Sequence, residues 1–431
     1  MNKFEFKNES LYCEDVSIEE LARTVDTPFY CYSAETLLRH LNAYKAGFRS
    51  IDHLICFSVK ANPSLAILSL LASAGAGADI VSGGDLYKAI AAGVPVRRIV
   101  YSGVGKTKKE IDYALNVNIL MFNVESEEEL QVINERAIAI GKKAPIALRI
   151  NPDIDPETHP HIATGLKINK FGIDIAKAME SYAHASKLNG IEVIGIDCHI
   201  GSQLTRLEPF QEALDVLLDL IKRLRDKGHC IKYLDIGGGL GIAYKDETPP
   251  HPNELGAAVA EKVKDKDVVL IVEPGRVICG NAGILVTRLL YRKFGESKNF
   301  YIVDAGMNDL IRPALYGSFH NIVPVSQHTT SPEIICDVVG PVCESADFLG
   351  KDRRLPLLEP GSLLAVCSAG AYGFAMSSNY NCRTKVAEVL VWKDRFEIIR
   401  QRENVEDLLK DEKIPSWLKL AAQQELALDQ Q

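Results

Sequence analysis

A lysine, a carboxylate and a histidine each come directly after a hydrophobic run of the chain. Lys60 ends the run in FSVKANP, Glu273 ends the run in VEPGR, and His199 follows another run in CHIGSQ. Partial burial at the mouth of a pocket lowers the pKa of a lysine and makes it able to attack a carbonyl. A carboxylate keeps a heterocyclic nitrogen protonated, and a histidine can lie flat against the same ring. Taken alone, Lys60 is better explained as a solvated lysine at a strand end.

A glycine-rich loop supplies the remaining part of such a site. LDIGGGLG places Gly237, Gly238 and Gly239 directly after a strand, where backbone N–H groups can surround a phosphate that Ser202 of CHIGSQ also reaches. The loop also resembles the glycine motif of methyltransferases and a Rossmann turn, but those follow the first strand of a sheet. This one follows the seventh, where barrels bind phosphate. Together the four parts are those needed to hold pyridoxal phosphate as a Schiff base.

Eight short β-branched runs alternate with amphipathic runs between residues 34 and 280. The strands are predicted at 54–59, 77–82, 99–103, 119–124, 145–152, 192–201, 233–239 and 268–275. Eight β-α repeats of this total length predict an α/β fold, a (β/α)8 TIM barrel. An open, doubly wound sheet is the alternative. Charged residues and glycines gather where these strands end, with Asp79 and Arg149 joining those above, as the barrel predicts for an active site.

The pattern changes after residue 280 to strands without intervening helices. This predicts a C-terminal antiparallel β-domain formed by residues 1–33 and 281–431, beside a barrel domain of residues 34–280. The opening FEFKNESLYCEDV is typical of a hairpin and is expected to pair with the second domain. Residues 405–428 have a helical pattern and are expected to cover an edge of the fold.

Composition limits the remaining classes of function. The net charge of −8 disfavours a nucleic-acid partner, and the sequence contains no apolar run long enough to cross a membrane. The charged N-terminus is unlike a signal peptide, so a cytoplasmic location is expected. Ten scattered cysteines form no C-x-x-C pair, and His159 and His161 lack nearby metal ligands, so we predict no metal site.

The sequence resembles a known family, the diaminopimelate decarboxylases. The motifs that carry the resemblance are FSVKANP, GADIVSGGDLYKA, RINP, GLKINKFGI, CHIGSQ, LDIGGGLGI, EPGR, DAGMNDLIRPALYG, GPVCESAD and AYGFAMSSNYN. They occur in the family's order from about residue 25 to residue 390. The resemblance implies the alanine-racemase-like fold, pyridoxal phosphate, a cytosolic homodimer with shared active sites, and the last step of lysine biosynthesis. Asp85 stands where relatives often carry Glu.

The resemblance also implies roles for individual residues. Lys60 would be the Schiff-base lysine, His199 would stack on the ring and Glu273 would face the pyridine nitrogen. The other residues expected to bind the cofactor are Asp79, Ser202, Gly237, Gly238, Gly239, Gly275, Arg276 and Tyr372. The residues expected to bind the substrate are Arg276, Arg312, Tyr316, Glu344 and Tyr372. Cys343 would be the proton donor, and both it and Glu344 would reach the pocket from the partner subunit.

The expected substrate is meso-diaminopimelate, and charge supports this choice. Ornithine and lysine end distally in an ammonium alone, whereas this chain offers Arg312 and Tyr316 in IRPALYG together with Glu344. An arginine fork binds a carboxylate with two hydrogen bonds, so the pattern favours a zwitterionic distal end. The alternative is that Arg312 belongs to a structural ion pair.

Three other functions stay open on the sequence. One is a decarboxylase of another basic amino acid, or an amino-acid racemase, on the same fold. Another is a non-catalytic relative that binds a partner, which intact Lys60, Cys343 and Glu273 disfavour. The third is a methyltransferase.

Overall fold

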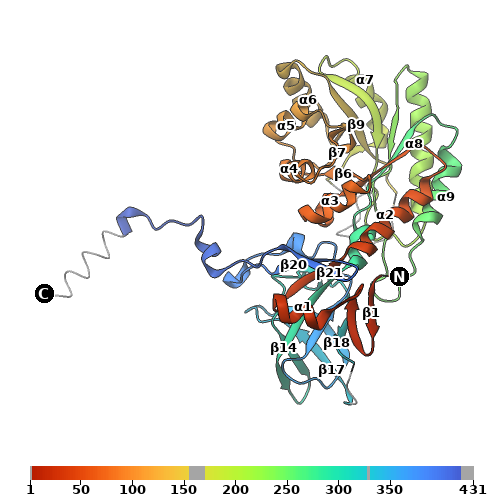
Figure 1. Ribbon diagram of the computed structural model, residues 1–431. Coiled ribbons are helices and arrows are strands. Elements are labelled where there is room, and N and C mark those ends of the chain that lie inside the picture. The colour runs from red at the N-terminus through yellow and green to blue at the C-terminus, as the bar shows by residue number, and fades with distance from the viewer. Residues whose placement is uncertain (1, 155–169, 328–330, 419–431) are drawn as a thin grey trace.

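The computed structural model describes residues 2–154, 170–327 and 331–418, and its larger part is a closed parallel barrel (Figure 1). The barrel strands, in spatial order, are β5 (His53–Ser58), β6 (Gly77–Ile80), β7 (Ile99–Tyr101), β8 (Met121–Val124), β9 (Ala144–Asn151), β11 (Ile191–Asp197), β12 (Tyr233–Asp235) and β13 (Val269–Val272). All eight predicted strands are present. Because β13 pairs with β5 in parallel, the sheet closes, which confirms the barrel and excludes the open sheet.

Helices surround the barrel because each has one apolar face. The longer ones are α2 (Ala34–Phe48), α3 (Leu65–Ser73), α4 (Gly83–Ala91), α5 (Lys108–Val117), α6 (Glu127–Ile140), α7 (Ala178–Ala185), α8 (Glu208–Asp226) and α9 (Pro252–Val263). In α8 the buried leucines Leu214, Leu217 and Leu224 recur at helical spacing and pack on the sheet. The chain leaves α8 through Gly228, whose φ of +89° suits a glycine.

The second part is a sheet of mixed direction. Its strands are β4 (Phe29–Ser33), β14 (Gly283–Phe294), β15 (Asn299–Val303), β16 (Ile322–Pro324), β17 (Glu333–Val339), β18 (Phe348–Pro356), β19 (Leu363–Val366), β20 (Ala387–Trp392) and β21 (Arg395–Arg400). Most pairs are antiparallel, as predicted, but β15 pairs with β17 and β4 pairs with β20 in parallel. The purely antiparallel prediction was wrong at these two pairs because side-chain alternation does not encode strand direction.

The N-terminal segment joins this second sheet in two ways. β1 (Phe4–Lys7) and β2 (Ser10–Cys13) form the predicted hairpin, and β3 (Val16–Ser17) extends it. The hairpin contacts the second sheet, because the amide of Leu11 donates to the carbonyl of Val325. After α1 (Ile18–Val25), β4 lies between β14 and β20.

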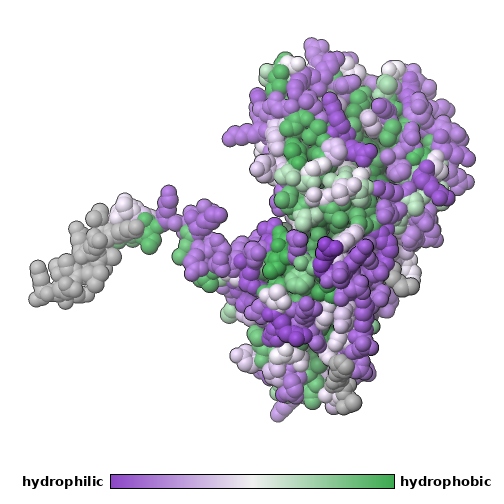
Figure 2. Space-filling view, viewed as in Figure 1, coloured by the Kyte–Doolittle hydropathy of each residue, from purple (hydrophilic) through white to green (hydrophobic). Residues whose placement is uncertain are grey.

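The C-terminal tail leaves the body of the molecule (Figure 1). After β21 its described residues form a 3-10 turn, η7 (Val405–Leu409), and Leu409, Ile414 and Trp417 are exposed. The described part of the tail, up to residue 418, carries both hydrophilic and hydrophobic residues (Figure 2). The prediction that this segment covers an edge of its own chain was therefore wrong for residues up to 418.

The two parts meet at the carboxyl ends of the barrel strands. The amide of Tyr372 donates to the carbonyl of Ala61, and the side chain of Asn62 donates to the carbonyl of Gly370. These bonds fix the loop after β5, which carries Lys60, against the loop that carries Tyr372. No helix among the described residues is long and apolar enough to span a membrane.

Candidate active site

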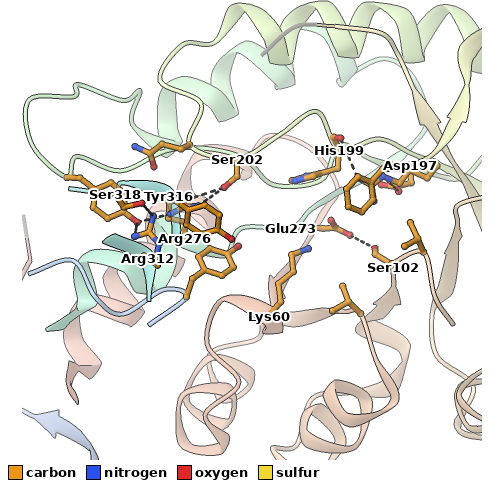
Figure 3. Close-up of a pocket in the computed structure, with 18 of the residues that line it drawn as sticks. Lys60, Ser102, Asp197, His199, Ser202, Glu273, Arg276, Arg312, Tyr316 and Ser318 are labelled. Carbon is orange, nitrogen blue, oxygen red and sulfur yellow. Dashed lines mark hydrogen bonds and ion pairs between the residues drawn. The ribbon is translucent and has the colours of Figure 1, made fainter. Parts of the chain in front are cut away.

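A cavity of about 720 Å³ lies where the barrel strands end, and residues of the second sheet close one side of it (Figure 3). Eight of the predicted site residues line it: Lys60, His199, Ser202, Glu273, Arg276, Arg312, Tyr316 and Tyr372. Asp79 lies behind Lys60 and is fully buried. Cys343 and Glu344 are exposed and do not line this cavity. His159 and His161 lie outside the described residues.

Lys60 is held by a buried carboxylate. Its Nζ lies 3.2 Å from Oδ2 of Asp79, which also accepts a hydrogen bond of 2.7 Å from Ser58. Burial alone lowers the pKa of Lys60, but the charges of Asp79, Tyr372 and Glu273 outweigh it and raise the pKa above the usual value. The expectation of a lowered pKa was therefore wrong, because the sequence does not show that these acids lie beside Lys60. Their charges stabilise the ammonium form of the amine.

Glu273 belongs to a group of buried acids at the bottom of the cavity. Its Oε1 accepts from Ser102 at 3.3 Å and from Asn123 at 3.4 Å, and one oxygen each of Glu273, Asp197 and Asp235 lie within 4.8 Å of one another. Burial and the like charges of its neighbours raise the pKa of Glu273 well above its usual range. Burial raises the pKa of Asp235 to about 6. Burial therefore favours the protonated form of these acids.

His199 is neutral and its tautomer is defined by the glycine loop. Burial, together with the charges of Arg149 and Lys60, lowers the pKa of His199 well below its usual value. Its Nδ1 accepts from the amide of Gly238 at 3.1 Å, so the ring proton resides on Nε2. A neutral, fixed imidazole in the cavity wall is suited to stack on a flat ring.

The glycine loop packs closely against its neighbours. A Cβ at Gly238 would lie 2.2 Å from the carbonyl oxygen of Glu273, and one at Gly237 would lie 2.6 Å from Nδ1 of His199. The amide of Gly237 already donates to Asp235 and that of Gly238 to His199. Among the described residues the amide of Gly239 has no acceptor, so of the three it is the one available to an anion.

The other end of the cavity is cationic. Nη1 of Arg276 and Nη1 of Arg312 both donate to the hydroxyl of Tyr244, at 2.7 Å and 2.9 Å. Arg276 also donates to Ser202 through Nη2 at 3.0 Å. Both guanidinium groups are buried, and neither forms an ion pair with a carboxylate among the described residues. The alternative of a structural ion pair at Arg312 is thus not supported there, and burial with this charge predicts an anionic ligand.

These features fit pyridoxal phosphate. An amine and a buried acid with a raised pKa lie at one end, and Oδ1 of Asp79 is buried there without a partner. Ser202, Arg276 and the amide of Gly239 offer donors for a phosphate at the carboxyl ends of β11, β12 and β13, and Tyr372 lies over Arg276 with 5.0 Å from Cζ to the ring centroid. The donor set is that of a cofactor with an aldehyde, a basic heterocycle and a phosphate.

Comparison with known proteins decides the family. Residues 34–280 match the model of the pyridoxal-dependent decarboxylases, pyridoxal binding domain. The diaminopimelate decarboxylase of Haemophilus influenzae is 51% identical over 95% of this chain and 98% of its own. The chain belongs to the diaminopimelate decarboxylase family. It is a carboxy-lyase that depends on pyridoxal phosphate, as members of this family are, and the predicted resemblance is confirmed.

Solved structures of family members have the same fold. Diaminopimelate decarboxylase from Helicobacter pylori, complexed with L-lysine, is 45% identical with a TM-score of 0.88, over 91% of this chain and 98% of that chain. The enzyme from M. jannaschii, also in co-complex with L-lysine, is 39% identical with a TM-score of 0.91, over 96% and 98%. The methyltransferase alternative is excluded by this family membership.

Sequence reasoning missed several residues of this decarboxylase site. Asp197 and Asp235 each end a hydrophobic strand, so the rule that identified Lys60 and Glu273 applies equally to them. Tyr244 lies in the loop between β12 and α9, outside every predicted element, and His320 follows α11 (Arg312–Tyr316). Neither has a pattern in the sequence that distinguishes it from an ordinary loop residue.

The only group of possible metal ligands among the described residues is Asp197, Asp235 and Glu273. Burial and the charge of Asp235 raise the pKa of Asp197 well above its usual value, and the pKa of Glu273 is raised as well. A raised pKa disfavours metal binding, because metal binding requires the deprotonated form of a carboxyl group. We keep the prediction of no metal at this place.

Proposed function

We propose the following assignment of roles for the decarboxylation of meso-diaminopimelate to L-lysine and carbon dioxide, the last step of lysine biosynthesis. The observation that carries it is that one cavity has two chemically different ends. One end holds an amine beside buried acids, and the other holds two guanidinium groups without a carboxylate partner. A substrate that joins the cofactor at one end and presents a carboxylate at the other satisfies both.

Bound pyridoxal phosphate supplies an electron sink for the carbon that loses carbon dioxide. Lys60 would hold the cofactor through its aldehyde carbon, and its amine would hold a proton close to the reacting carbon. Asp79 keeps that amine in position through the contact of 3.2 Å. Glu273, whose pKa is raised by burial and by the neighbouring acids, would face the ring nitrogen and keep it protonated. His199 supports the ring face.

The cofactor phosphate would be held by donors from three consecutive strand ends. Ser202 follows β11, the Gly237–Gly239 turn follows β12, and Gly275 and Arg276 follow β13. A Cβ at Gly275 would lie 2.9 Å from Cβ of Ser58, so the residue type keeps this loop close to the loop that bears Lys60. Tyr372, whose backbone φ of +55° is held by its bond to Ala61, completes the group.

The distal carboxylate of the substrate is bound by Arg312, Arg276 and Tyr316, with Tyr372 beside them. Fixing this far end orients the scissile bond relative to the ring, which is how a decarboxylase of this type selects the bond that breaks. A substrate without the carboxylate leaves buried cations unpaired, which costs several kcal/mol and roughly 10³-fold in specificity.

A homodimer with shared sites completes the assignment. Cys343 and Glu344 are exposed on their own chain, and a hydrogen bond of 2.8 Å from the Cys343 amide to Asn381 fixes their loop. In the dimer, this loop enters the partner's cavity. There Cys343, or alternatively the ammonium of Lys60, would supply the proton to the carbon that lost carbon dioxide, and Glu344 would bind the distal amine.

Subunit mixing tests the shared site. The variants Lys60→Ala and Cys343→Ala are each expected to be nearly inactive. Dissociated and reassociated in equal amounts, they form hybrid dimers in which one of two sites is intact, so about a quarter of wild-type activity should return. If the mixture stays inactive while native mass spectrometry shows hybrids, Cys343 acts in its own chain or not at all.

Substrate preference tests the reaction itself. Carbon dioxide release is measured from meso-diaminopimelate, ornithine, arginine and lysine with the same enzyme preparation. The expected result is a kcat/KM for meso-diaminopimelate at least about 10³-fold above the others. Equal or greater release from ornithine, arginine or lysine would contradict the proposed substrate, and racemisation without release would indicate a racemase.

We further propose a cytoplasmic enzyme with no nucleic-acid or membrane partner. All ten cysteines are free in the structure, as suits a reducing compartment, and the net charge is −8. The division into a barrel domain of residues 34–280 and a β-domain of residues 1–33 and 281–431 is also our proposal. The boundary at residue 34 is supported by β4, because this strand ends at Ser33 and belongs to the second sheet.

A further inference from the structure

Tyr244 occupies an unusual place between the two arginines of the cavity. Its hydroxyl oxygen accepts from Arg276 at 2.7 Å and from Arg312 at 2.9 Å, and its ring lies 4.8 Å from Cζ of Arg312. A phenol oxygen that accepts two hydrogen bonds still has its own hydrogen to donate. Among the described residues no acceptor for that hydrogen is present, and the side chain lines the cavity.

His320 contacts Arg312 and helps to fix its guanidinium group. It is fully buried, and its Nδ1 lies 2.9 Å from the carbonyl oxygen of Cys367 while its Nε2 lies 3.0 Å from Nη1 of Arg312. A carbonyl can only accept and a guanidinium can only donate, so the ring proton resides on Nδ1 and Nε2 accepts. Burial and the charge of Arg312 lower the pKa of His320 to about 3, so this arrangement holds throughout the neutral range.

These contacts decide which edge of Arg312 is available. Tyr244 and His320 take both hydrogens of Nη1, and Ser318 takes one hydrogen of Nη2 at 3.2 Å. Nε–H and the second hydrogen of Nη2 have no acceptor among the described residues. Nε and Nη2 lie on the same edge of the guanidinium, and an edge of this kind can bind a carboxylate through two parallel hydrogen bonds.

We propose that Tyr244 contacts the substrate, its hydroxyl donating to the distal carboxylate, and that His320 is a positioning residue that turns the free edge of Arg312 to the same carboxylate. This inference rests on the proposed function and adds two residues to its specificity site. The hydroxyl donor is neutral, so it binds the anion without adding a third buried charge beside two guanidinium groups.

The test compares two inhibitors that differ in one carboxylate. L-lysine carries the distal carboxylate, and 1,5-diaminopentane lacks it. In Tyr244→Phe the Ki of L-lysine should rise about 10- to 100-fold, since a hydrogen bond to a charged group is lost, while the Ki of 1,5-diaminopentane stays within about twofold. Tyr182→Phe is the matched control, because it removes a buried hydroxyl that donates to Gly195 away from the cavity.

A cofactor titration distinguishes the two anions that the hydroxyl could serve. If Tyr244 bound the cofactor phosphate instead, Tyr244→Phe would raise the Kd of pyridoxal phosphate and weaken both inhibitors alike, which would overturn the proposal. Equal inhibition constants in Tyr244→Phe and wild type would also overturn it. A crystal structure of the holoenzyme with L-lysine should place the Tyr244 hydroxyl within about 3 Å of the carboxylate; a separation beyond hydrogen-bond reach rejects direct contact.

Two substitutions of His320 test its positioning role. His320→Gln keeps an acceptor for Arg312 and should leave the Ki of L-lysine within about threefold, whereas His320→Leu should raise it about tenfold. A purely structural role would weaken L-lysine and 1,5-diaminopentane equally in His320→Leu. Wild-type enzyme that releases no carbon dioxide from meso-diaminopimelate would instead contradict the proposed function itself.

Discussion

The two ends of the cavity are both buried, but their charges are balanced in opposite ways. At the Lys60 end, Asp79, Asp197, Asp235 and Glu273 outnumber the cations, and burial raises the pKa values of Asp197, Asp235 and Glu273. At the Arg312 end, guanidinium groups share a phenol instead of a carboxylate, and burial together with Arg276 lowers the pKa of Arg312. Burial is common to both ends, so the difference comes from the residues placed there.

This contrast indicates what each end is prepared to bind. A buried carboxyl group with a raised pKa is suited to keep a heterocycle protonated, and guanidinium groups without a carboxylate partner stabilise an anion. The chemistry belongs to the first end and the selection of substrate to the second. Substitutions at the first end should therefore reduce turnover, and substitutions at the second should reduce specificity.

The largest expected effect comes from Lys60→Ala. Loss of the amine removes both the covalent attachment of the cofactor and a proton source, so kcat should fall by about 10⁴-fold or more and the absorbance of the bound cofactor should change. Steady-state kinetics and absorption spectra of the purified variant measure this. Lys222→Ala, on the exposed face of α8, is the control. Full turnover in Lys60→Ala would refute the assignment.

Arg312→Ala tests the opposite end. The variant removes the guanidinium that binds the distal carboxylate of the substrate. The kcat/KM for meso-diaminopimelate should therefore fall about 10³-fold. The cofactor absorbance should stay as in wild type. A comparable loss in cofactor affinity would show that the two ends are not separate in function.

Glu273→Gln sharpens the comparison at the acidic end. An amide gives no proton to the ring nitrogen, so kcat should fall about 10²-fold while KM changes little. Rapid kinetics with meso-diaminopimelate measure both quantities, and Glu192→Gln on the exposed side of β11 serves as control. If KM rises instead with kcat unchanged, Glu273 binds substrate and its proposed role is wrong.

The smallest effect concerns the pH dependence of stability. The pKa of Asp235 in the folded state is raised to about 6, so its contribution to stability is full below the unfolded pKa and is lost as pH rises through about 6. Asp235→Asn removes this loss. Relative to wild type, the variant should gain about 1–2 kcal/mol in unfolding free energy between pH 5 and pH 8. Urea unfolding of the cofactor-free proteins measures it, and a relative loss contradicts the raised pKa.

Much of the fold could be predicted from the sequence because the barrel depends on local patterns. Each strand is a short apolar run, and the eight runs have helical segments between them, so their number and order favour the barrel, and the pairing of β13 with β5 decides against the open sheet. The parallel pairs β15–β17 and β4–β20 depend on contacts between segments far apart in the chain, which no local pattern records. The tail was predicted to cover an edge of the fold because its apolar residues recur at helical spacing. That spacing does not say which surface the apolar face contacts, so the prediction failed.

The candidate site divides in the same way. Lys60, His199 and Glu273 were found because they end strands, and a barrel brings all strand ends to one face. The raised pKa of Lys60 could not be predicted, since it depends on Asp79 and Glu273 lying beside it in space. Tyr244 and His320 act through the geometry of Arg312, and geometry of that kind is visible only in the structure.

The central claim is that Lys60 joins covalently to an aldehyde cofactor opposite an acid that keeps the ring cationic. The most direct measurement is borohydride reduction of the purified holoenzyme, followed by peptide mapping. The account predicts one pyridoxyl label, on the peptide that contains Lys60, with loss of the visible absorbance and of turnover. A protein that stays colourless with excess pyridoxal phosphate, or that carries the label on another lysine, would contradict it.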